Sequence, residues 1–198
     1  MLDQDGYCVL VDFGFARVLS DSEKAFTVCG TPLYLAPEVI INRGYHRSAD
    51  NWSFGCLVYE MLVGQNPFYS KSISKIQLFK RIVRGDYQIP DWACLSDNAV
   101  NLLENLLVVN PLRRLGGGAG EPTNDKSDQD IRSHAWLAEY SSTDLLHKNL
   151  EAPWIPQNDS SLQGLNFENW DHVRERLSKR NIAELQLTPS DQARFDDF

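Results

Sequence analysis

Two short runs of this sequence carry residues that could take part in chemistry. Asp12 ends an apolar stretch, and Gly14 allows the backbone to turn sharply just after it. A carboxylate in that position either caps the turn or holds a divalent cation, and the spacing leaves both roles open. Further along, Glu38 closes a loop that contains the hydroxyl groups of Thr27 and Thr31.

The elements that position these residues are expected to be mainly helices. A tight turn at 4–6 leads into one strand over 7–12, and 13–42 is expected to be an ordered loop because it holds glycine and proline and lacks periodicity. Helices are predicted over 50–62, over 74–84, from the cap at 96–97 to a point before Pro111, and around 131–136.

The helix predicted over 50–62 has hardly any polar face, so we expect it to be buried on all sides as the central helix of the domain. The next two helices are amphipathic. Their expected buried residues are Ile76, Phe79, Ile82 and Val83 in the first, and Val100, Leu103, Leu106 and Leu107 in the second.

Composition narrows the class of protein. The formal net charge of −8 argues against nucleic acid or an anionic membrane as the main partner and is compatible with basic peptides. The four cysteines lack C-x-x-C spacing, so small buried thiols are expected rather than disulfides or a metal site. No apolar run approaches the roughly 18 residues of a membrane span, and the first residues do not resemble a signal peptide. We expect a soluble, cytoplasmic protein.

Several motifs occur in an order that is typical of one family. The sequence resembles the larger lobe of AGC-group serine/threonine protein kinases, in particular the cyclic-nucleotide-dependent kinases. The resemblance is carried by residues 12–17 (D-F-G-F-A-R), 27–32 (T-V-C-G-T-P), 34–38 (Y-L-A-P-E), 50–55 (D-N-W-S-F-G), 114–116 (R-L-G), 152–156 (A-P-W-I-P) and 195–198 (F-D-D-F). D-F-G alone arises by chance, whereas these blocks at kinase spacing are specific.

The resemblance implies a mainly α fold, the kinase large lobe followed by an extended tail. We expect a partial kinase domain over 1–137, starting with the strand before D-F-G, and an AGC C-terminal extension over 138–198. The Gly-rich loop, the V-A-I-K lysine and the H-R-D-x-x-x-x-N catalytic loop of protein kinases do not occur in the 198 residues. The expected protein is therefore a fragment that lacks a catalytic base and the small lobe of a longer parent, and that is inactive alone.

The same resemblance implies roles in ATP- and Mg²⁺-dependent phosphoryl transfer. Asp12 would hold Mg²⁺ across the β- and γ-phosphates of ATP, whose charge the metal neutralises. Thr27 would be the activation-loop phosphorylation site, with Arg17 as one cation for the phosphate. Thr31 would support the catalytic aspartate, which this chain lacks, and is associated with serine or threonine as the acceptor.

Implied substrates are basic proteins. Val28, Pro32 and Leu35 would form the apolar wall for the substrate residue after the phosphoacceptor, and Glu60 would pair with a substrate arginine. Leu33 departs from the family pattern, in which an acid at this position helps to read basic residues.

Other family residues have structural or docking roles. Glu38 and Arg114 would form a buried ion pair that ties the activation segment to the lobe. Asp50 would accept bonds from the catalytic-loop backbone, so without that loop we expect a buried carboxylate that lacks its donors. Phe195 and Phe198 resemble the hydrophobic motif that docks in a groove of the small lobe, or on an upstream activating kinase.

Two further hypotheses stay open at this point. The chain could be a non-catalytic binding or docking module derived from a kinase lobe. Alternatively, it could be an enzyme that works in trans with a separately made small lobe.

Overall fold

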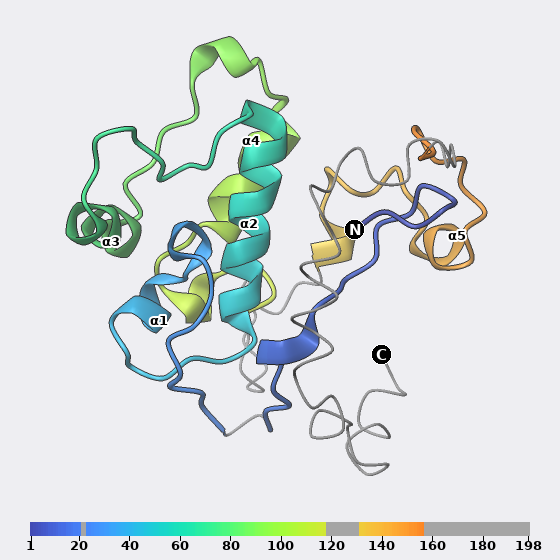
Figure 1. Ribbon diagram of the computed structural model, residues 1–198. Coiled ribbons are helices and arrows are strands. Elements are labelled where there is room, and N and C mark those ends of the chain that lie inside the picture. Colours follow the sequence, from blue (N-terminus) through green and yellow to red (C-terminus); the bar gives the residue numbers. More distant parts are fainter. Residues whose placement is uncertain (21–22, 118–130, 157–198) are drawn as a thin grey trace, which may run out of the picture. The chain divides into compact units, whose positions relative to one another are not determined.

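The computed structural model describes residues 1–20, 23–117 and 131–156, and its regular structure there is helical (Figure 1). The α-helices are α1 (Pro37–Ile40), α2 (Ser48–Val63), α3 (Lys75–Arg84), α4 (Asp97–Leu106) and α5 (Ser142–Leu146). Short 3₁₀ helices are η1 (Phe13–Phe15), η2 (Pro32–Tyr34), η3 (Asp91–Ala93), η4 (Pro111–Arg113) and η6 (Ile131–Ser133). The mainly α fold class expected from the sequence is confirmed for these residues.

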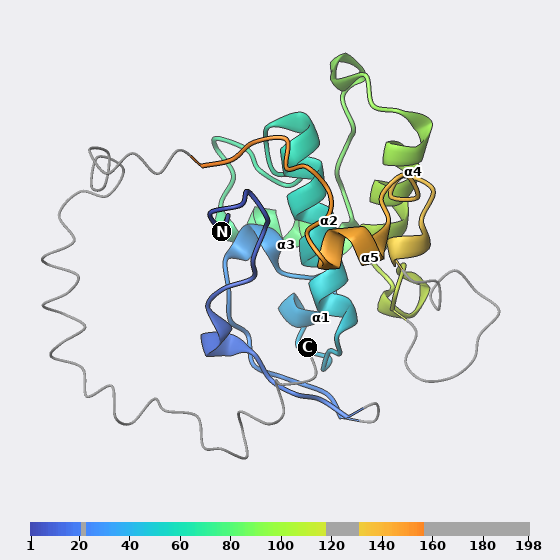
Figure 2. The same ribbon diagram turned by 90° about the vertical axis from the view of Figure 1, so that its right-hand side faces the viewer.

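The chain forms two compact units. One combines Met1–Val18 with the chain from Lys148 onward, and the other comprises Leu19–His147. The second unit contains the helices α1 to α5, and within it α2 lies alongside α4 (Figures 1 and 2).

Local signals in the sequence explain where the longer helices begin and end. Ser74 and Gln77 form a capping box at the start of α3, in which the Ser74 hydroxyl accepts from the Gln77 amide and the Gln77 side chain accepts from the Ser74 amide. Ser96 caps α4 in a similar way through the amide of Ala99. Gly64 ends α2 with a φ of 80°, a left-handed conformation that glycine adopts without strain.

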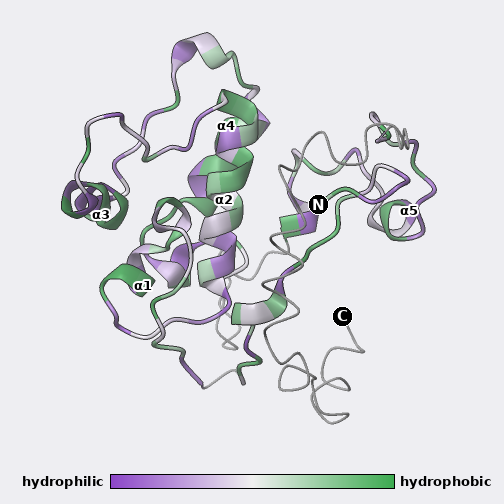
Figure 3. Cartoon of the chain, in the orientation of Figure 1, coloured by the Kyte–Doolittle hydropathy of each residue, from purple (hydrophilic) through white to green (hydrophobic). Residues whose placement is uncertain are grey.

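Helix α2 contributes to both clusters of buried side chains in the second unit. One cluster contains Leu35, Ala36, Val39, Ala49, Trp52, Cys56, Phe68, Leu78, Ile82 and Leu107. The other contains Val58, Tyr59, Leu102, Leu103, Leu106 and Leu115. Hydrophobic residues recur along both α2 and α4 (Figure 3), and the central position predicted for the helix over 50–62 is the one observed.

Burial of α2 on all sides, however, was a wrong prediction. Phe54, Leu57 and Met61 are 36%, 46% and 66% exposed. With Asp50, whose side chain is also exposed, they recur at helical spacing and share one face of α2. We call these four residues the open face of α2. Periodicity reports that a residue is apolar, but it does not report whether a neighbouring element covers it.

Other local expectations also need correction. The strand predicted over 7–12 is replaced by an isolated bridge between Leu2 and Cys8. Val9 to Val11 are exposed there. Val9 exchanges backbone hydrogen bonds with Met1 at 2.8 and 2.9 Å, but in the described residues the pairing does not continue to Leu10 and Val11. The loop expected over 13–42 contains the short helix α1, and α5 was not predicted at all. Both are single turns, too short to show a hydrophobic period.

Burial was predicted correctly for only some of the side chains of α3 and some of the cysteines. On α3, Ile82 is buried as expected, but Ile76 is 69% exposed and Leu78 is buried in its place. Among the cysteines, Cys56 is buried, and burial raises the pKa of its thiol to about 12. Cys8 and Cys94 are exposed, contrary to the expectation of buried thiols.

Gly55 provides a test of the α2–α4 contact. A Cβ on Gly55 would come 2.9 Å from Leu106 Cβ and 3.0 Å from Leu107 Cδ2. Alanine ordinarily favours a helix over glycine by about 0.8–1.0 kcal/mol, whereas an extra buried carbon typically costs about 1–3 kcal/mol. Because Leu106 Cβ is fixed to its backbone, we expect the packing effect to win. Urea denaturation of Gly55→Ala should show a free energy of unfolding lower by about 1 kcal/mol.

The matched control is Met61→Ala on the open face of the same helix, which should change the free energy of unfolding by less than about 0.5 kcal/mol. A Gly55→Ala variant more stable than the parent would contradict the close packing of α2 on α4.

Candidate substrate site and its scaffold

The loop that holds the predicted substrate residues is fastened to α2 by polar contacts. Ser53 Oγ donates to the carbonyl of Tyr34 at 2.8 Å, and Asn66 Nδ2 donates to the carbonyl of Leu33 at 3.4 Å. The Tyr34 hydroxyl in turn donates to Glu60 Oε2 at 2.6 Å. Asn66 lies shortly after the end of α2. The three bonds thus hold η2 and its flanking residues against the helix and the segment that follows it.

The pair formed by Tyr34 and Glu60 is the main electrostatic feature of this surface. Hydrogen bonding to the Glu60 carboxylate, with partial burial, raises the pKa of Tyr34 to about 12. The tyrosine is therefore a neutral donor at physiological pH and fixes one oxygen of Glu60. A carboxylate accepts several bonds, so a half-buried Glu60 can still bind a guanidinium group.

The residues expected to form the apolar wall are not equally accessible. Val28 is 54% exposed, Pro32 is half-buried, and Leu35 is buried at 8% exposure in the core cluster with Trp52. Leu35 therefore anchors the loop to the hydrophobic core and presents little surface to a ligand. Thr31 is exposed at the start of η2.

The expected phosphorylation site also lies on an ordered part of the loop. The Tyr45 hydroxyl donates to the backbone carbonyl of Thr27 at 2.6 Å, and Ala25 pairs with Tyr45 in an isolated bridge. Thr27 itself is exposed. Its backbone is thus held while its hydroxyl group is open to a modifying enzyme.

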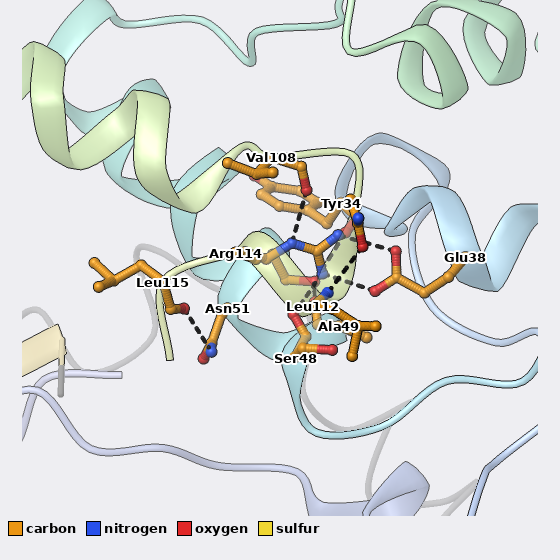
Figure 4. A network of polar contacts seen from close by, with 11 residues as sticks. Tyr34, Glu38, Ser48, Ala49, Asn51, Val108, Leu112, Arg114 and Leu115 are labelled. Atoms are coloured by element: carbon orange, nitrogen blue, oxygen red, sulfur yellow. Dashed lines mark hydrogen bonds and ion pairs between the residues drawn. The ribbon is translucent and has the colours of Figure 1, made fainter. Parts of the chain in front are cut away.

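Glu38 and Arg114 form a buried, bidentate ion pair (Figure 4). Arg114 Nη1 lies 2.7 Å from Glu38 Oε1 and Nη2 lies 2.9 Å from Oε2. The guanidinium also donates to the carbonyls of Ser48 at 2.6 Å and of Val108 at 3.0 Å, and its carbon lies 5.2 Å from the centre of the Trp52 ring. The guanidinium therefore makes four hydrogen bonds through its three nitrogen atoms, which offset the loss of water around a buried charge.

This network joins elements that are distant in sequence. Glu38 belongs to α1, Ser48 begins α2, and Arg114 follows η4. Asn51 adds a further link, because its side-chain amide donates to the carbonyl of Leu115 at 3.0 Å (Figure 4). The end of the loop from 27 to 38 is consequently fixed to the start of the central helix.

Asp50 does not occupy the environment expected for it. We expected a buried carboxylate without donors, but its side chain is exposed on the first turn of α2. Partial removal of water by the surrounding protein still raises its pKa. The correction follows from the open face of α2: within the second unit no described element covers the side on which Asp50 lies.

Asp12 belongs to the other unit and is exposed. Its backbone is left-handed, with a φ of 66°, and its Oδ1 accepts from the Gly14 amide at 3.3 Å. In the described ranges no three His, Cys, Asp or Glu side chains come together as a metal site. Asp12 fits Mg²⁺ nonetheless, because this ion is commonly held by one or two carboxylates together with phosphate oxygens and water.

Some expected residues cannot be placed, and others were missed. Phe195 and Phe198 lie outside the described residues. Sequence reasoning did not single out Tyr34 or Ser53, which fix the loop to α2. Ser53 bonds to a backbone carbonyl, and Tyr34 bonds to the side chain of a residue 26 positions away. Neither kind of contact produces a recognisable pattern in the sequence.

The comparison with known proteins defines the class of this chain. Residues 1–137 match the family model of the protein kinase domain, and the chain belongs to the protein kinase family. No described helix is long and apolar enough to cross a membrane.

Its relatives confirm the expected resemblance to AGC-group serine/threonine kinases. cAMP-dependent protein kinase catalytic subunit 2 of Drosophila melanogaster is 34% identical over 90% of this chain and 49% of the relative. Serine/threonine-protein kinase akt-1 of Caenorhabditis elegans is 39% identical over 85% of this chain and 30% of the relative. Serine/threonine-protein kinase gad8 of Schizosaccharomyces pombe is 31% identical over 100% of this chain and 33% of the relative. The chain thus spans half or less of the length of these kinases.

The buried ion pair should dominate the stability of the second unit. Glu38→Ala leaves the Arg114 charge without its counter-ion, so we expect the free energy of unfolding to fall by about 3–5 kcal/mol. Asp86→Ala is the control, because Asp86 lies 4.0 Å from Arg81 in a pair whose side chains are 62% and 30% exposed, and ion pairs near the surface contribute about 0–1 kcal/mol. Equal losses in the two variants, measured by urea denaturation, would contradict the role of burial.

The Tyr34–Glu60 bond predicts a pH-dependent difference in stability. The unfolded tyrosine loses its proton near pH 10.0 and the folded one near pH 12. Between these values the unfolded state has released a proton that the folded state retains, so the stability from this group is complete below pH 10 and declines as pH rises. Tyr34→Phe should be less stable by about 0.5–1 kcal/mol at pH 8, and the gap should close toward pH 12.

The control is Tyr140→Phe, which removes a 61% exposed hydroxyl group. It should stay within about 0.5 kcal/mol of the parent at both pH values. A gap between parent and Tyr34→Phe that widens with pH would have the wrong sign for the proposed bond.

Proposed function

We propose that this chain supplies the activation segment and the substrate-facing part of a serine/threonine kinase that uses ATP and Mg²⁺ to phosphorylate basic proteins. The observation that carries the proposal is the open face of α2. Asp50 lies in the first turn of α2, at the N-terminal end of this face. By resemblance to the family, its carboxylate accepts hydrogen bonds from the backbone of the catalytic loop. A helix that is central to the fold and yet exposes Phe54, Leu57 and Met61 is suited to receive that missing part of the lobe.

The proposed roles in phosphoryl transfer divide between the two units. Asp12 would hold Mg²⁺, and this ion would supply positive charge against the phosphates of ATP. Thr27 is the site at which phosphorylation orders the loop, since a phosphate adds about −1.5 to −2 charges. Thr31 would support the aspartate of an H-R-D loop, which these 198 residues do not contain. Glu38 with Arg114 holds the end of the activation segment.

Substrate recognition is assigned to the surface built on η2 and α2. Glu60, oriented by Tyr34, pairs with an arginine upstream of the phosphoacceptor. Val28 and Pro32 contact the residue after the acceptor, with Leu35 supporting them from the core.

We further propose that the 198 residues alone transfer no phosphate. The Gly-rich loop, the V-A-I-K lysine and the H-R-D loop are absent from the sequence, so neither the nucleotide phosphates nor the acceptor hydroxyl has its usual partner. The division at 137/138 between a partial kinase domain and a C-terminal extension belongs to the same proposal. We also propose that Phe195 and Phe198 dock on the small lobe of the parent kinase or on an upstream activating kinase.

A second candidate function is a non-catalytic docking module. The open face of α2 favours it too, because contiguous exposed apolar residues mark protein–protein contacts. The sequence of the transcript upstream of the Met1 codon separates the two. An in-frame H-R-D-x-x-x-x-N and Gly-rich loop support the kinase proposal, and their absence favours the docking module.

The direct test uses an arginine-rich serine peptide and the isolated chain. We expect no phosphate transfer from radiolabelled ATP with Mg²⁺, but weak peptide binding by fluorescence anisotropy. Glu60→Gln should raise the Kd about 2- to 5-fold, the range for a partly exposed ion pair, whereas Glu104→Gln on the exposed side of α4 should leave it unchanged. Turnover by the chain free of contaminating kinase, or equal binding by both variants, would contradict the proposal.

A further inference from the structure

The first unit is built around a tight turn over residues 3–7. Asp3 Oδ1 accepts from the amides of Asp5 at 3.0 Å and Tyr7 at 2.8 Å, and the Asp3 amide donates to the Tyr7 carbonyl at 2.8 Å. Gly6 has a φ of 84°, which a glycine adopts without strain. The turn therefore has a fixed backbone, and both acidic side chains are attached to it.

Lys148, which lies far away in the sequence, binds both of these acids. Its Nζ lies 2.6 Å from Asp3 Oδ2 and 2.9 Å from Asp5 Oδ2, and it sits 5.5 Å from the centre of the Tyr7 ring. The hydrogen bond from Lys148 is the main cause that lowers the pKa of Asp3. Asp3 is therefore charged at neutral pH, and one ammonium group contacts the carboxyl groups of both Asp3 and Asp5.

The backbone after Lys148 fits the same turn closely. The Tyr7 hydroxyl donates to the carbonyl of Leu150. A Cβ on Gly6 would lie 2.8 Å from Ala152 Cβ and closer still to the carbonyl oxygen of Trp154. Glycine at position 6 is thus required for a second reason, because residues 152–154 occupy the space that any side chain would need.

We propose that residues 148–154 form a strap that Lys148 fastens to the turn by charge, and that loss of the Lys148 charge or high ionic strength loosens the strap at its Lys148 end. Lys148 and Asp5 are about half exposed, at 47% and 52% of their side chains, and salt screens exposed ion pairs. The fit at Gly6 is steric and insensitive to salt. The strap therefore has one contact that ionic conditions weaken and one that they do not.

The backbone of Lys148 decides which substitution tests its charge. Lys148 directly follows the C-cap of α5 and has a φ of 56°, the left-handed conformation that commonly ends a helix. Asparagine tolerates the same conformation and has no charge, so Lys148→Asn removes the fastening without disturbing the backbone. The inference does not depend on the proposed function.

Zero-length crosslinking with a carbodiimide tests the strap in the full chain. The distances predict an amide between Lys148 and Asp3 or Asp5, identified as a crosslinked peptide by mass spectrometry. At 50 mM NaCl we expect this product to be at least 5-fold more abundant than any crosslink of Lys71, an exposed control lysine. At 1 M NaCl it should fall about 3-fold or more, because the Debye length shortens to roughly 3 Å.

Gly6→Ala separates the steric contact from the charged one. It keeps all three charged groups but fills the space taken by residues 152–154, so the crosslink should fall several-fold even at 50 mM NaCl. The thermal unfolding of the second unit should be unchanged and serves as the check on folding. An unaltered crosslink in Gly6→Ala would overturn the strap.

Hydrogen exchange of the turn provides the second measurement. The amides of Asp3, Asp5 and Tyr7 should exchange about 3- to 10-fold faster in Lys148→Asn than in the parent, and Lys71→Asn should match the parent. In the double variant with Asp5→Asn the two effects should not add, because Asp5 and Lys148 act through one contact. Additive effects, or unchanged exchange in Lys148→Asn, would overturn the proposal.

Discussion

The buried charge of Arg114 is the constraint on which the second unit depends. A guanidinium removed from water must find a counter-ion and acceptors for its donors, or the fold that buries it is not stable. Glu38 supplies the charge, and the carbonyls of Ser48 and Val108 supply further acceptors. Because these groups come from separate elements, the guanidinium is satisfied only when α1, the start of α2 and the chain after α4 are all in place.

That constraint also explains how an irregular loop can present a defined surface. The loop is fixed at its end by Glu38 and in its middle by the bonds of Tyr34 to Ser53 and Glu60. Thr27 and Thr31 stay exposed on this fixed backbone. A loop that is anchored at several points and carries exposed hydroxyl groups suits the proposed roles in phosphorylation and substrate binding, because function on loops depends on a rigid support.

The two units use charge in opposite ways. The ion pair of Glu38 and Arg114 is buried, so salt screens it little and its loss leaves an uncompensated charge in the core. The contact of Lys148 with Asp3 and Asp5 is exposed, and water and salt weaken it. The first arrangement suits a permanent scaffold, whereas the second suits a contact that opens and closes.

The sequence by itself determined the mainly α fold, the longer helices and the family, because caps such as Ser74 and Ser96, hydrophobic periods and ordered motifs are local signals. It also paired Glu38 with Arg114 through the family resemblance. Only the tertiary structure decided that one face of α2 is open, that Asp50 is exposed and Leu35 buried, and that Lys148 meets the turn at 3–7. Each of these depends on which segment covers a side chain, and that is a property of contacts between residues far apart in the chain.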